Sequence, residues 1–198
     1  MGLANRITLS RAFLSPVLFL FFFMPIWVEG LRVPSTIGMW VVFGLIEISD
    51  VLDGWFARRS GQVTDLGKIL DPFADVISRI TYFVCLAGVG IVPAWILLVI
   101  IYRELAVSYI RHDLFSRNYA LAAKLLGKVK AIAYSTSCGL GFLLVTCERF
   151  IAPERVTLTL RHVSQVGFIV AVTLSISSLV QYVKVYSDKR RTGTEQER

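Results

Sequence analysis

Four aspartates stand at spacings that gather carboxylates on helix faces. Asp50 and Asp53 are three residues apart, and Asp71 and Asp75 are four residues apart. Residues at these spacings share one face of an α-helix. Both pairs adjoin apolar stretches, where an ionisable group is costly and therefore indicates a function. If the segment between the pairs folds the two helices antiparallel, all four carboxylates meet at one depth.

Such a cluster is expected to bind metal ions. Four carboxylates in one place repel one another unless protons or cations intervene. Hard oxygen ligands without a nearby set of His or Cys favour Mg²⁺ or Mn²⁺ over zinc. These ions commonly bridge phosphoryl oxygens and neutralise the charge that develops on them. The spacing of the aspartates therefore predicts metal-dependent phosphate chemistry.

The neighbouring residues suit a phosphate ligand. Gly54, Ala57 and Gly67 lack bulk, so a flat ligand or another backbone can approach closely. Arg58 lies about one turn after Gly54 and can offer a forked donor to a phosphate.

Spacing alone leaves structural interpretations open. The second aspartate pair can stabilise a helix N-terminus. The first pair can form ion pairs with Arg58 and Arg59, and the small residues can serve helix packing alone.

The composition indicates a membrane protein. Of 198 residues, 55% are hydrophobic and 18% are charged, whereas soluble domains carry about 25% charged residues. The mean hydropathy is +0.65, which excludes a disordered chain. Only three cysteines are present, too few for a disulfide scaffold. The net charge of +7 fits cations that face the cytoplasm and anionic headgroups better than it fits nucleic-acid binding.

Six apolar stretches predict membrane-spanning helices, which need about 20 mostly apolar residues. They lie within 12–28, 36–48, 69–92, 94–110, 131–146 and 163–183. Gly88, Gly90 and Pro93 predict a tight turn between the third and the fourth. A signal peptide is the alternative for the first stretch, but no small-x-small cleavage site follows it. We expect an all-α integral membrane protein with six transmembrane helices and a polar metal site at the cytoplasmic side.

The cations divide unequally between the two ends of these helices. Segments 29–34, 89–93 and 148–162 are expected to connect helices on one side, which holds 4 of the 21 Lys and Arg residues. The other side takes the remaining 17, with segments 58–68 and 111–130 and both termini. Cationic loops stay in the cytoplasm, so both termini and the aspartates are expected to face it, in a multi-pass protein of the cell membrane. The membrane domain is expected to cover 1–187, followed by a polar, frayed tail over 188–198.

The aspartates belong to a longer pattern, D-x2-D-G-x2-A-R-x8-G-x3-D-x3-D, which is filled at every fixed position from Asp50 to Asp75. This segment resembles the signature of the CDP-alcohol phosphotransferase family, the class I CDP-alcohol phosphatidyltransferases. The resemblance implies a dimeric integral membrane enzyme with six transmembrane helices. Such an enzyme transfers a substituted phosphate from a CDP-linked donor to an alcohol and releases CMP.

The resemblance also implies roles for individual residues. Asp50, Asp53, Asp71 and Asp75 would hold a pair of Mg²⁺ or Mn²⁺ ions on the donor pyrophosphate. Asp75 would also take the proton from the acceptor hydroxyl and is the expected catalytic residue. The expected contacts to the CDP donor are Asn5, Thr8, Gly54, Ala57, Arg58, Thr64 and Gly67.

Within the family, the chain most resembles the phosphatidylglycerophosphate synthases. Three segments carry this likeness: Asn5-Arg-Ile-Thr8-Leu-Ser-Arg11, Arg103-Glu104-x3-Ser108-x2-Arg111 and Gly127-Lys128-Val-Lys130. The likeness implies transfer of the phosphatidyl group of CDP-diacylglycerol to sn-glycerol 3-phosphate in phospholipid biosynthesis, giving phosphatidylglycerophosphate and CMP. Paired cations would hold the dianionic acceptor, and we expect them to be Arg103, Arg111, Lys128 and Lys130.

Three positions depart from that subfamily and leave other acceptors open. Val76 follows Asp75 where lysine is usual, Ala131 follows Lys130 where threonine is usual, and Lys124 stands where a small polar residue is common. Inositol phosphate, choline or a similar alcohol are the alternative acceptors. An ion-coupled transporter with intramembrane acids is the alternative from another class, although the sequence shows no inverted repeat.

Overall fold

The computed structural model describes the backbone of residues 3–60, 65–116 and 125–196. Side chains are described over 8–52, 72–114 and 129–189, together with Gly127. Within these ranges the regular structure is entirely helical, as the apolar stretches predict. In chain order the elements are α1 (Leu3–Trp27), the 3₁₀ turn η1 (Glu29–Leu31), α2 (Arg32–Ser60), α3 (Asp65–Gly88), α4 (Ala94–Ser116), α5 (Leu125–Arg149) and α6 (Glu154–Gln196).

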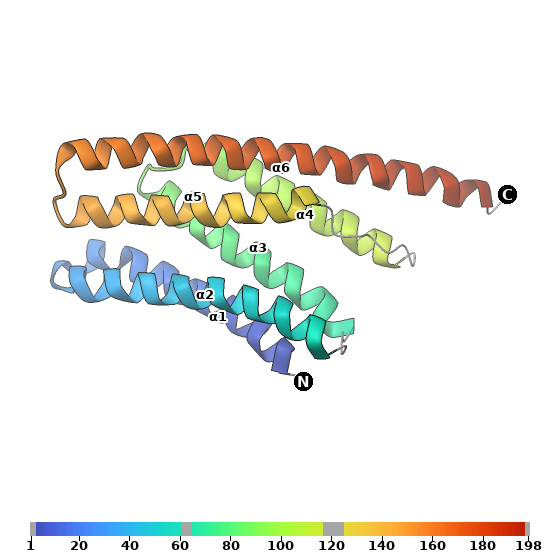
Figure 1. Cartoon of the computed structure of the whole chain (residues 1–198), viewed down its shortest axis with the longest axis horizontal. Helices are drawn as coiled ribbons and strands as arrows, with labels where there is room; N and C mark the ends of the chain where they lie inside the picture. Colours follow the sequence, from blue (N-terminus) through green and yellow to red (C-terminus); the bar gives the residue numbers. More distant parts are fainter. Residues whose placement is uncertain (1–2, 61–64, 117–124, 197–198) are drawn as a thin grey trace.

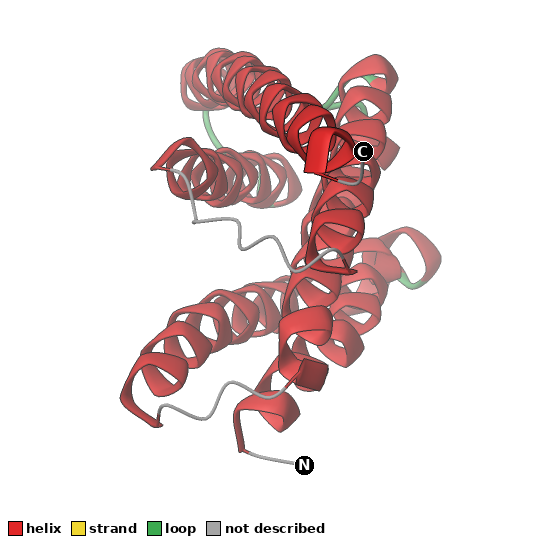
Figure 2. Ribbon diagram, turned by 90° about the vertical axis from the view of Figure 1, so that its right-hand side faces the viewer, coloured by secondary structure: helices red, strands yellow, loops and turns green. Residues whose placement is uncertain are grey.

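The helices form a bundle (Figure 1). The connections α1–α2, α3–α4 and α5–α6 lie together at the left of Figure 1. Both termini lie at the opposite end, which faces the viewer in Figure 2, along with the end of α2 and the start of α5. The three described connections therefore lie at the end opposite the two termini, as the sequence predicts.

The turn between α3 and α4 is the tight turn predicted from its glycines and proline. The N–H groups of Gly90 and Ile91 donate to the carbonyls of Ala87 and Leu86 at the end of α3. Gly90 has a φ of 75°, a left-handed conformation that glycine adopts without a steric penalty. Pro93 then directly precedes α4.

Helix α6 is longer at both ends than the sequence analysis predicts. It begins at Glu154, so the connection expected over 148–162 is confined to 150–153. The carbonyl of Pro153 accepts bonds from the N–H groups of Val156 and Thr157, which starts the helix early. At its other end α6 continues to Gln196, into the polar tail predicted over 188–198. Lys, Arg, Glu and Gln are good helix formers, so hydropathy alone underestimates the length of such a helix.

An aromatic core fixes the helices that carry the charged residues. Phe22 of α1, Phe43 of α2, Tyr82 of α3 and Phe142 of α5 pack with ring centroids between 5.2 and 5.8 Å apart. Tilted and edge-to-face pairs of this kind add about 0.5–1.5 kcal/mol each beyond the burial of their area. Helix α1 packs on both α2 and α3, and α6 packs on α4 and α5.

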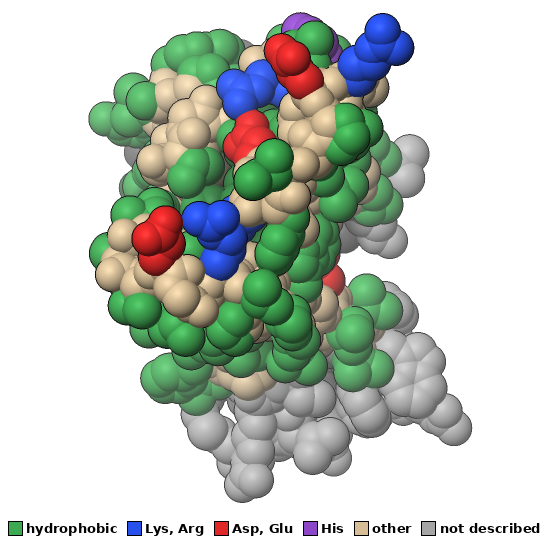
Figure 3. All heavy atoms as spheres, turned by 90° about the vertical axis from the view of Figure 1, so that its left-hand side faces the viewer, with side chains coloured by type: hydrophobic (Ala, Val, Ile, Leu, Met, Phe, Trp, Pro, Cys, Tyr) green, Lys and Arg blue, Asp and Glu red, His purple; other side chains and the backbone are tan. Residues whose placement is uncertain are grey.

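The outer surface of the bundle is suited to lipid. In the described part of the chain, four segments have the length and hydropathy of a membrane span: Thr8–Trp27, Glu29–Leu52, Val129–Arg149 and Glu154–Lys189. Large apolar side chains point outward, including Phe13 (68% exposed) and Val51 (70% exposed). Figure 3 looks onto the end with the three short connections, where side chains of both charges lie among hydrophobic ones. The chain is a multi-pass membrane protein.

Candidate active site

Two of the four aspartates in the pattern have described side chains, and these lie together. Asp50 is in α2 and Asp75 is in α3. Nη1 of Arg11, in α1, is 2.5 Å from Oδ1 of Asp50 and 2.7 Å from Oδ1 of Asp75. One guanidinium nitrogen thus joins carboxylates from two helices. Asp50 and Asp75 are two of the four aspartates that were expected to meet if these helices fold antiparallel.

Arg11 reaches the two aspartates because of the way α1 packs on α3. The Ser15 hydroxyl, one turn after Arg11, is 2.8 Å from the Arg11 carbonyl and 3.0 Å from Oγ of Ser78. Ser78 lies three residues after Asp75, so both are on one face of α3. Arg11 itself is 1% exposed, and a buried charge requires a counter-charge. Asp50 and Asp75 supply it.

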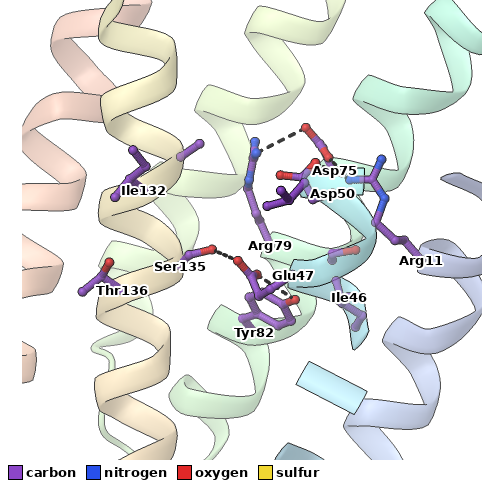
Figure 4. Close-up of a pocket in the computed structure, with 13 residues that line it drawn as sticks. Arg11, Ile46, Glu47, Asp50, Asp75, Arg79, Tyr82, Ile132, Ser135 and Thr136 are labelled. Carbon is purple, nitrogen blue, oxygen red and sulfur yellow. Dashed lines mark hydrogen bonds and ion pairs between the residues drawn. The ribbon is translucent and has the colours of Figure 1, made fainter. Parts of the chain in front are cut away.

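A cavity of about 210 Å³ lies beside these carboxylates (Figure 4). Its lining comes from α1, α2, α3 and α5. The polar residues of the lining are Arg11, Glu47, Asp50, Asp75, Ser78, Arg79, Tyr82, Ser135 and Thr136.

Glu47 and Arg79 are the other charged residues of the lining. Glu47 lies one turn before Asp50 and accepts a hydrogen bond from the Tyr82 hydroxyl at 3.1 Å. Its second oxygen accepts one from the Ser135 hydroxyl, so Glu47 ties α2 to α3 and α5. Nη2 of Arg79 is 3.2 Å from Oδ2 of Asp75.

The donor atoms at this junction fit a hard divalent cation. Carboxylate oxygens are the ligands that Mg²⁺ and Mn²⁺ prefer. Asp50 and Asp75 already converge on one cationic atom at 2.5 and 2.7 Å, so their side chains are oriented to share a positive charge. Among the described side chains, no group of three or more acids, histidines or cysteines is placed to hold a metal ion. Asp53 and Asp71 fall outside that part of the chain.

The expected donor contacts are only partly described. Thr8 is 4% exposed on α1, one turn before Arg11. Thr64 lies outside the described residues. Seven other predicted site residues lie in helices, with side chains outside the described part: Asn5 in α1, Asp53, Gly54, Ala57 and Arg58 in α2, and Gly67 and Asp71 in α3.

Two of the expected acceptor cations are buried around a carboxylate. Nζ of Lys130 is 2.5 Å from Oε1 of Glu104, and Nη1 of Arg103 is 2.9 Å from the same atom. Arg103 also donates to Oγ of Ser178 at 2.9 Å, and Lys130 lies 4.7 Å from the ring centroid of Tyr134. This cluster joins α4, α5 and α6 inside the bundle.

The other two expected acceptor cations lie elsewhere. Arg111 is exposed, and its Nη2 donates to the Tyr182 hydroxyl of α6 at 2.7 Å. Lys128 belongs to α5, and its side chain is outside the described part. The described lining of the cavity includes neither Arg103, Arg111 nor Lys130.

Four charged residues of this region have no role in the sequence analysis. Arg11, Glu47 and Arg79 stand at helical spacings from Thr8, Asp50 and Asp75, so a search of each helix face identifies them. Glu104 directly follows Arg103. Adjacent residues do not share a helix face, so only the structure reveals this contact.

Comparisons with known proteins agree with the sequence pattern. The family model described as CDP-alcohol phosphatidyltransferase matches residues 1–180. A CDP-diacylglycerol–glycerol-3-phosphate 3-phosphatidyltransferase of Treponema pallidum is 30% identical over 193 residues, covering 94% of this chain and 89% of that protein. Proteins of the same description from Bacillus subtilis and Shigella flexneri are 34% and 28% identical, covering 67% and 92% of this chain and 72% and 93% of theirs. The chain therefore belongs to the CDP-alcohol phosphatidyltransferase family.

Proposed function

We infer that this protein transfers the phosphatidyl group of CDP-diacylglycerol to sn-glycerol 3-phosphate and releases CMP. The product is phosphatidylglycerophosphate, a precursor in phospholipid biosynthesis. The observation that carries this inference is the meeting of Asp50 and Asp75 at one cation. It occurs in a chain that matches glycerol-phosphate phosphatidyltransferases over most of its length.

In the proposed reaction, an acceptor hydroxyl oxygen attacks the phosphorus atom that carries diacylglycerol. The bond from that phosphorus to the bridging oxygen of the pyrophosphate breaks, and CMP leaves with that oxygen. The hydroxyl proton passes to Asp75, which lies at the cavity wall. No covalent intermediate with the protein is needed.

We propose that Asp50, Asp53, Asp71 and Asp75 hold the Mg²⁺ or Mn²⁺ ions of the site. When bound, these ions neutralise charge on the donor pyrophosphate as Lewis acids. The aspartates themselves orient the donor, and Arg11 keeps Asp50 and Asp75 facing each other from the side of α1. Asn5, Thr8, Gly54, Ala57, Arg58, Thr64 and Gly67 are proposed as contacts of the CDP group.

Arg103, Arg111, Lys128 and Lys130 remain the cations proposed from sequence for the acceptor. The buried Arg103–Glu104–Lys130 cluster carries two cations and one anion. The net positive charge of this cluster would attract an anionic acceptor, because opposite charges attract strongly where water is scarce.

We propose that α3 and α4 cross the membrane as well. They have 24 and 23 residues, and at 1.5 Å per residue each is about 35 Å long, enough for a hydrocarbon core of about 30 Å. Both termini and the aspartates then face the cytoplasm, the side that the positive-inside rule favours. The membrane domain of 1–187 would work as a homodimer, with 188–198 on the cytoplasmic side.

The test is release of CMP from CDP-diacylglycerol by the purified protein in micelles. Release with sn-glycerol 3-phosphate and Mg²⁺, abolished by a chelator, is the expected result. Release only with choline or inositol phosphate would move the protein to another acceptor within the family. Ion flux through proteoliposomes, without CMP release, would favour the transporter alternative.

A further inference from the structure

The cavity beside Asp75 contains a cation to which no role has been assigned. Arg79 lies one turn after Asp75 on α3, and its side chain is 19% exposed. It approaches Asp75 at 3.2 Å, whereas Arg11 approaches the other oxygen of Asp75 at 2.7 Å. Charge-assisted bonds are normally about 2.7–2.9 Å long, so Asp75 holds Arg11 closely and Arg79 loosely. A guanidinium carries five N–H donors, and this contact with Asp75 uses one of them.

The other charged groups of the lining are engaged more closely than Arg79. Glu47 accepts hydrogen bonds from Tyr82 and Ser135. Arg11 contacts both Asp50 and Asp75. Figure 4 shows the guanidinium of Arg79 between Asp75 and the α5 side of the cavity. Among the described lining residues, Arg79 is therefore the cation best placed to bind an incoming anion.

The cavity can hold a small phosphate ester. Its volume is about 210 Å³. Ser135 and Thr136 add hydroxyl groups to its wall, which suits a ligand that itself carries hydroxyls.

We propose that this cavity is the acceptor site and that Arg79 binds the phosphate of the acceptor there. Arg79 takes this role in place of Arg103, Arg111 and Lys130, which the described lining does not include. The acceptor is then a small hydroxylated phosphate ester, whose reacting hydroxyl lies at the neighbouring Asp75. This proposal rests on the proposed function and adds to it the place where the acceptor binds and a residue that binds its phosphate.

Three considerations support Arg79 in this role. A guanidinium binds phosphate through two parallel hydrogen bonds. Binding of a divalent cation by Asp50 and Asp75 would weaken the attraction of Asp75 for Arg79, so a phosphate dianion would become its better partner. The chain also has Val76 where the synthases it resembles have lysine, and Arg79 lies three residues later on the same face of α3. Arg79 thus restores a cation to that face.

The experiment compares Arg79→Gln, Arg79→Lys and the wild type in micelles. We expect Arg79→Gln to raise the KM for glycerol 3-phosphate by about 10- to 150-fold, the effect of losing one charged hydrogen-bonding partner. The KM for CDP-diacylglycerol should stay unchanged. Inorganic phosphate should inhibit competitively with the acceptor, and its inhibition constant should rise in parallel. Arg79→Lys should fall between the two, because a point charge replaces a forked donor.

The matched control is Arg155→Gln, which removes an exposed arginine in the first turn of α6. This helix begins at the end of the bundle with the short connections (Figure 1), and the change should alter none of these constants. Arg79→Gln could instead lower kcat and leave unchanged both the KM for glycerol 3-phosphate and the inhibition constant of inorganic phosphate. In that case Arg79 only positions Asp75, and the proposal is wrong. If Arg79→Gln does not fold, Arg79→Ala takes its place, with the same expected rise in both constants and the same refuting outcome. Failure of the proposed function would look different: the wild type would release no CMP with glycerol 3-phosphate. Direct calorimetric binding of glycerol 3-phosphate, lost in Arg79→Gln, would still support the anion site in that case.

Discussion

Replacing Glu104 by glutamine tests whether the buried ion cluster holds α4, α5 and α6 together. Glu104 is 4% exposed and accepts from Lys130 at 2.5 Å and from Arg103 at 2.9 Å. Removing one partner of a buried ion pair costs about 3–5 kcal/mol, because the other charge remains buried without compensation. The glutamine side chain keeps the shape of glutamate, so the measured loss reports the charge.

The remaining contacts place the expected loss at the lower end of that range. Arg103 keeps Ser178 and the Ser175 carbonyl as hydrogen-bond acceptors. Lys130 keeps the Tyr134 ring, a cation–π contact worth about 1–2 kcal/mol in a desolvated place. We therefore expect Glu104→Gln to lower the free energy of unfolding by about 3 kcal/mol. For a chain of this size that corresponds to a fall in Tm of about 6–12 °C.

Thermal unfolding in micelles, followed by circular dichroism, measures this difference. The control is Glu148→Gln, because Glu148 pairs with Arg161 at 2.6 Å while both side chains are more than a third exposed. An exposed ion pair is worth about 1 kcal/mol or less. Adding Lys130→Met to Glu104→Gln should recover part of the loss, since it removes a stranded charge. If Glu104→Gln costs no more than Glu148→Gln, the cluster is not a structural ion pair.

Three further predictions follow from the aspartate junction and the topology. Asp75→Asn should lower turnover by at least about 100-fold, the scale of losing a general base or a metal ligand, and full turnover in excess chelator would contradict the metal mechanism. Arg11→Met should lower Tm more in chelator than in Mg²⁺. A cation bound by Asp50 and Asp75 stabilises the folded state by mass action and so replaces the charge lost with Arg11. An equal loss of Tm in both conditions would show that Arg11 and the metal do not share these carboxylates. In cells expressing a chain without its own cysteines, Glu195→Cys should resist an impermeant thiol reagent and Arg155→Cys should react with it; the opposite pattern would reverse the orientation.

Much of the fold could be predicted because a helix that spans a membrane requires a long run of apolar residues. Each apolar stretch became a helix, and Gly90 and Pro93 gave the turn between α3 and α4. The ends of α6 could not be found in this way, because polar residues such as Lys189 continue a helix without raising its hydropathy. Pro153 lies in the connection that was expected there, and its carbonyl accepts the first hydrogen bonds of α6, so the helix begins directly after it.

The candidate site was predictable in its residue types and less so in its contacts. The spacing of Asp50 and Asp75 places each carboxylate on a helix face, but the rotation of α1 against them decides that Arg11 joins the two. A sequence shows that Arg103 and Lys130 are cations near one membrane surface. It does not show that Glu104 stands between them, because that contact depends on how α4, α5 and α6 cross.

The junction at Arg11 bears on the order in which the protein is made. Its three contacting side chains come from α1, α2 and α3, so the carboxylate centre is complete once the ribosome has released the first 88 residues. The cavity wall formed by Ser135 and Thr136 belongs to α5 and is added later. During synthesis, when N-terminal parts fold first, the first three helices can therefore leave the translocon with Asp50 and Asp75 already paired with Arg11. The acceptor pocket then closes only when the second half of the chain inserts beside them.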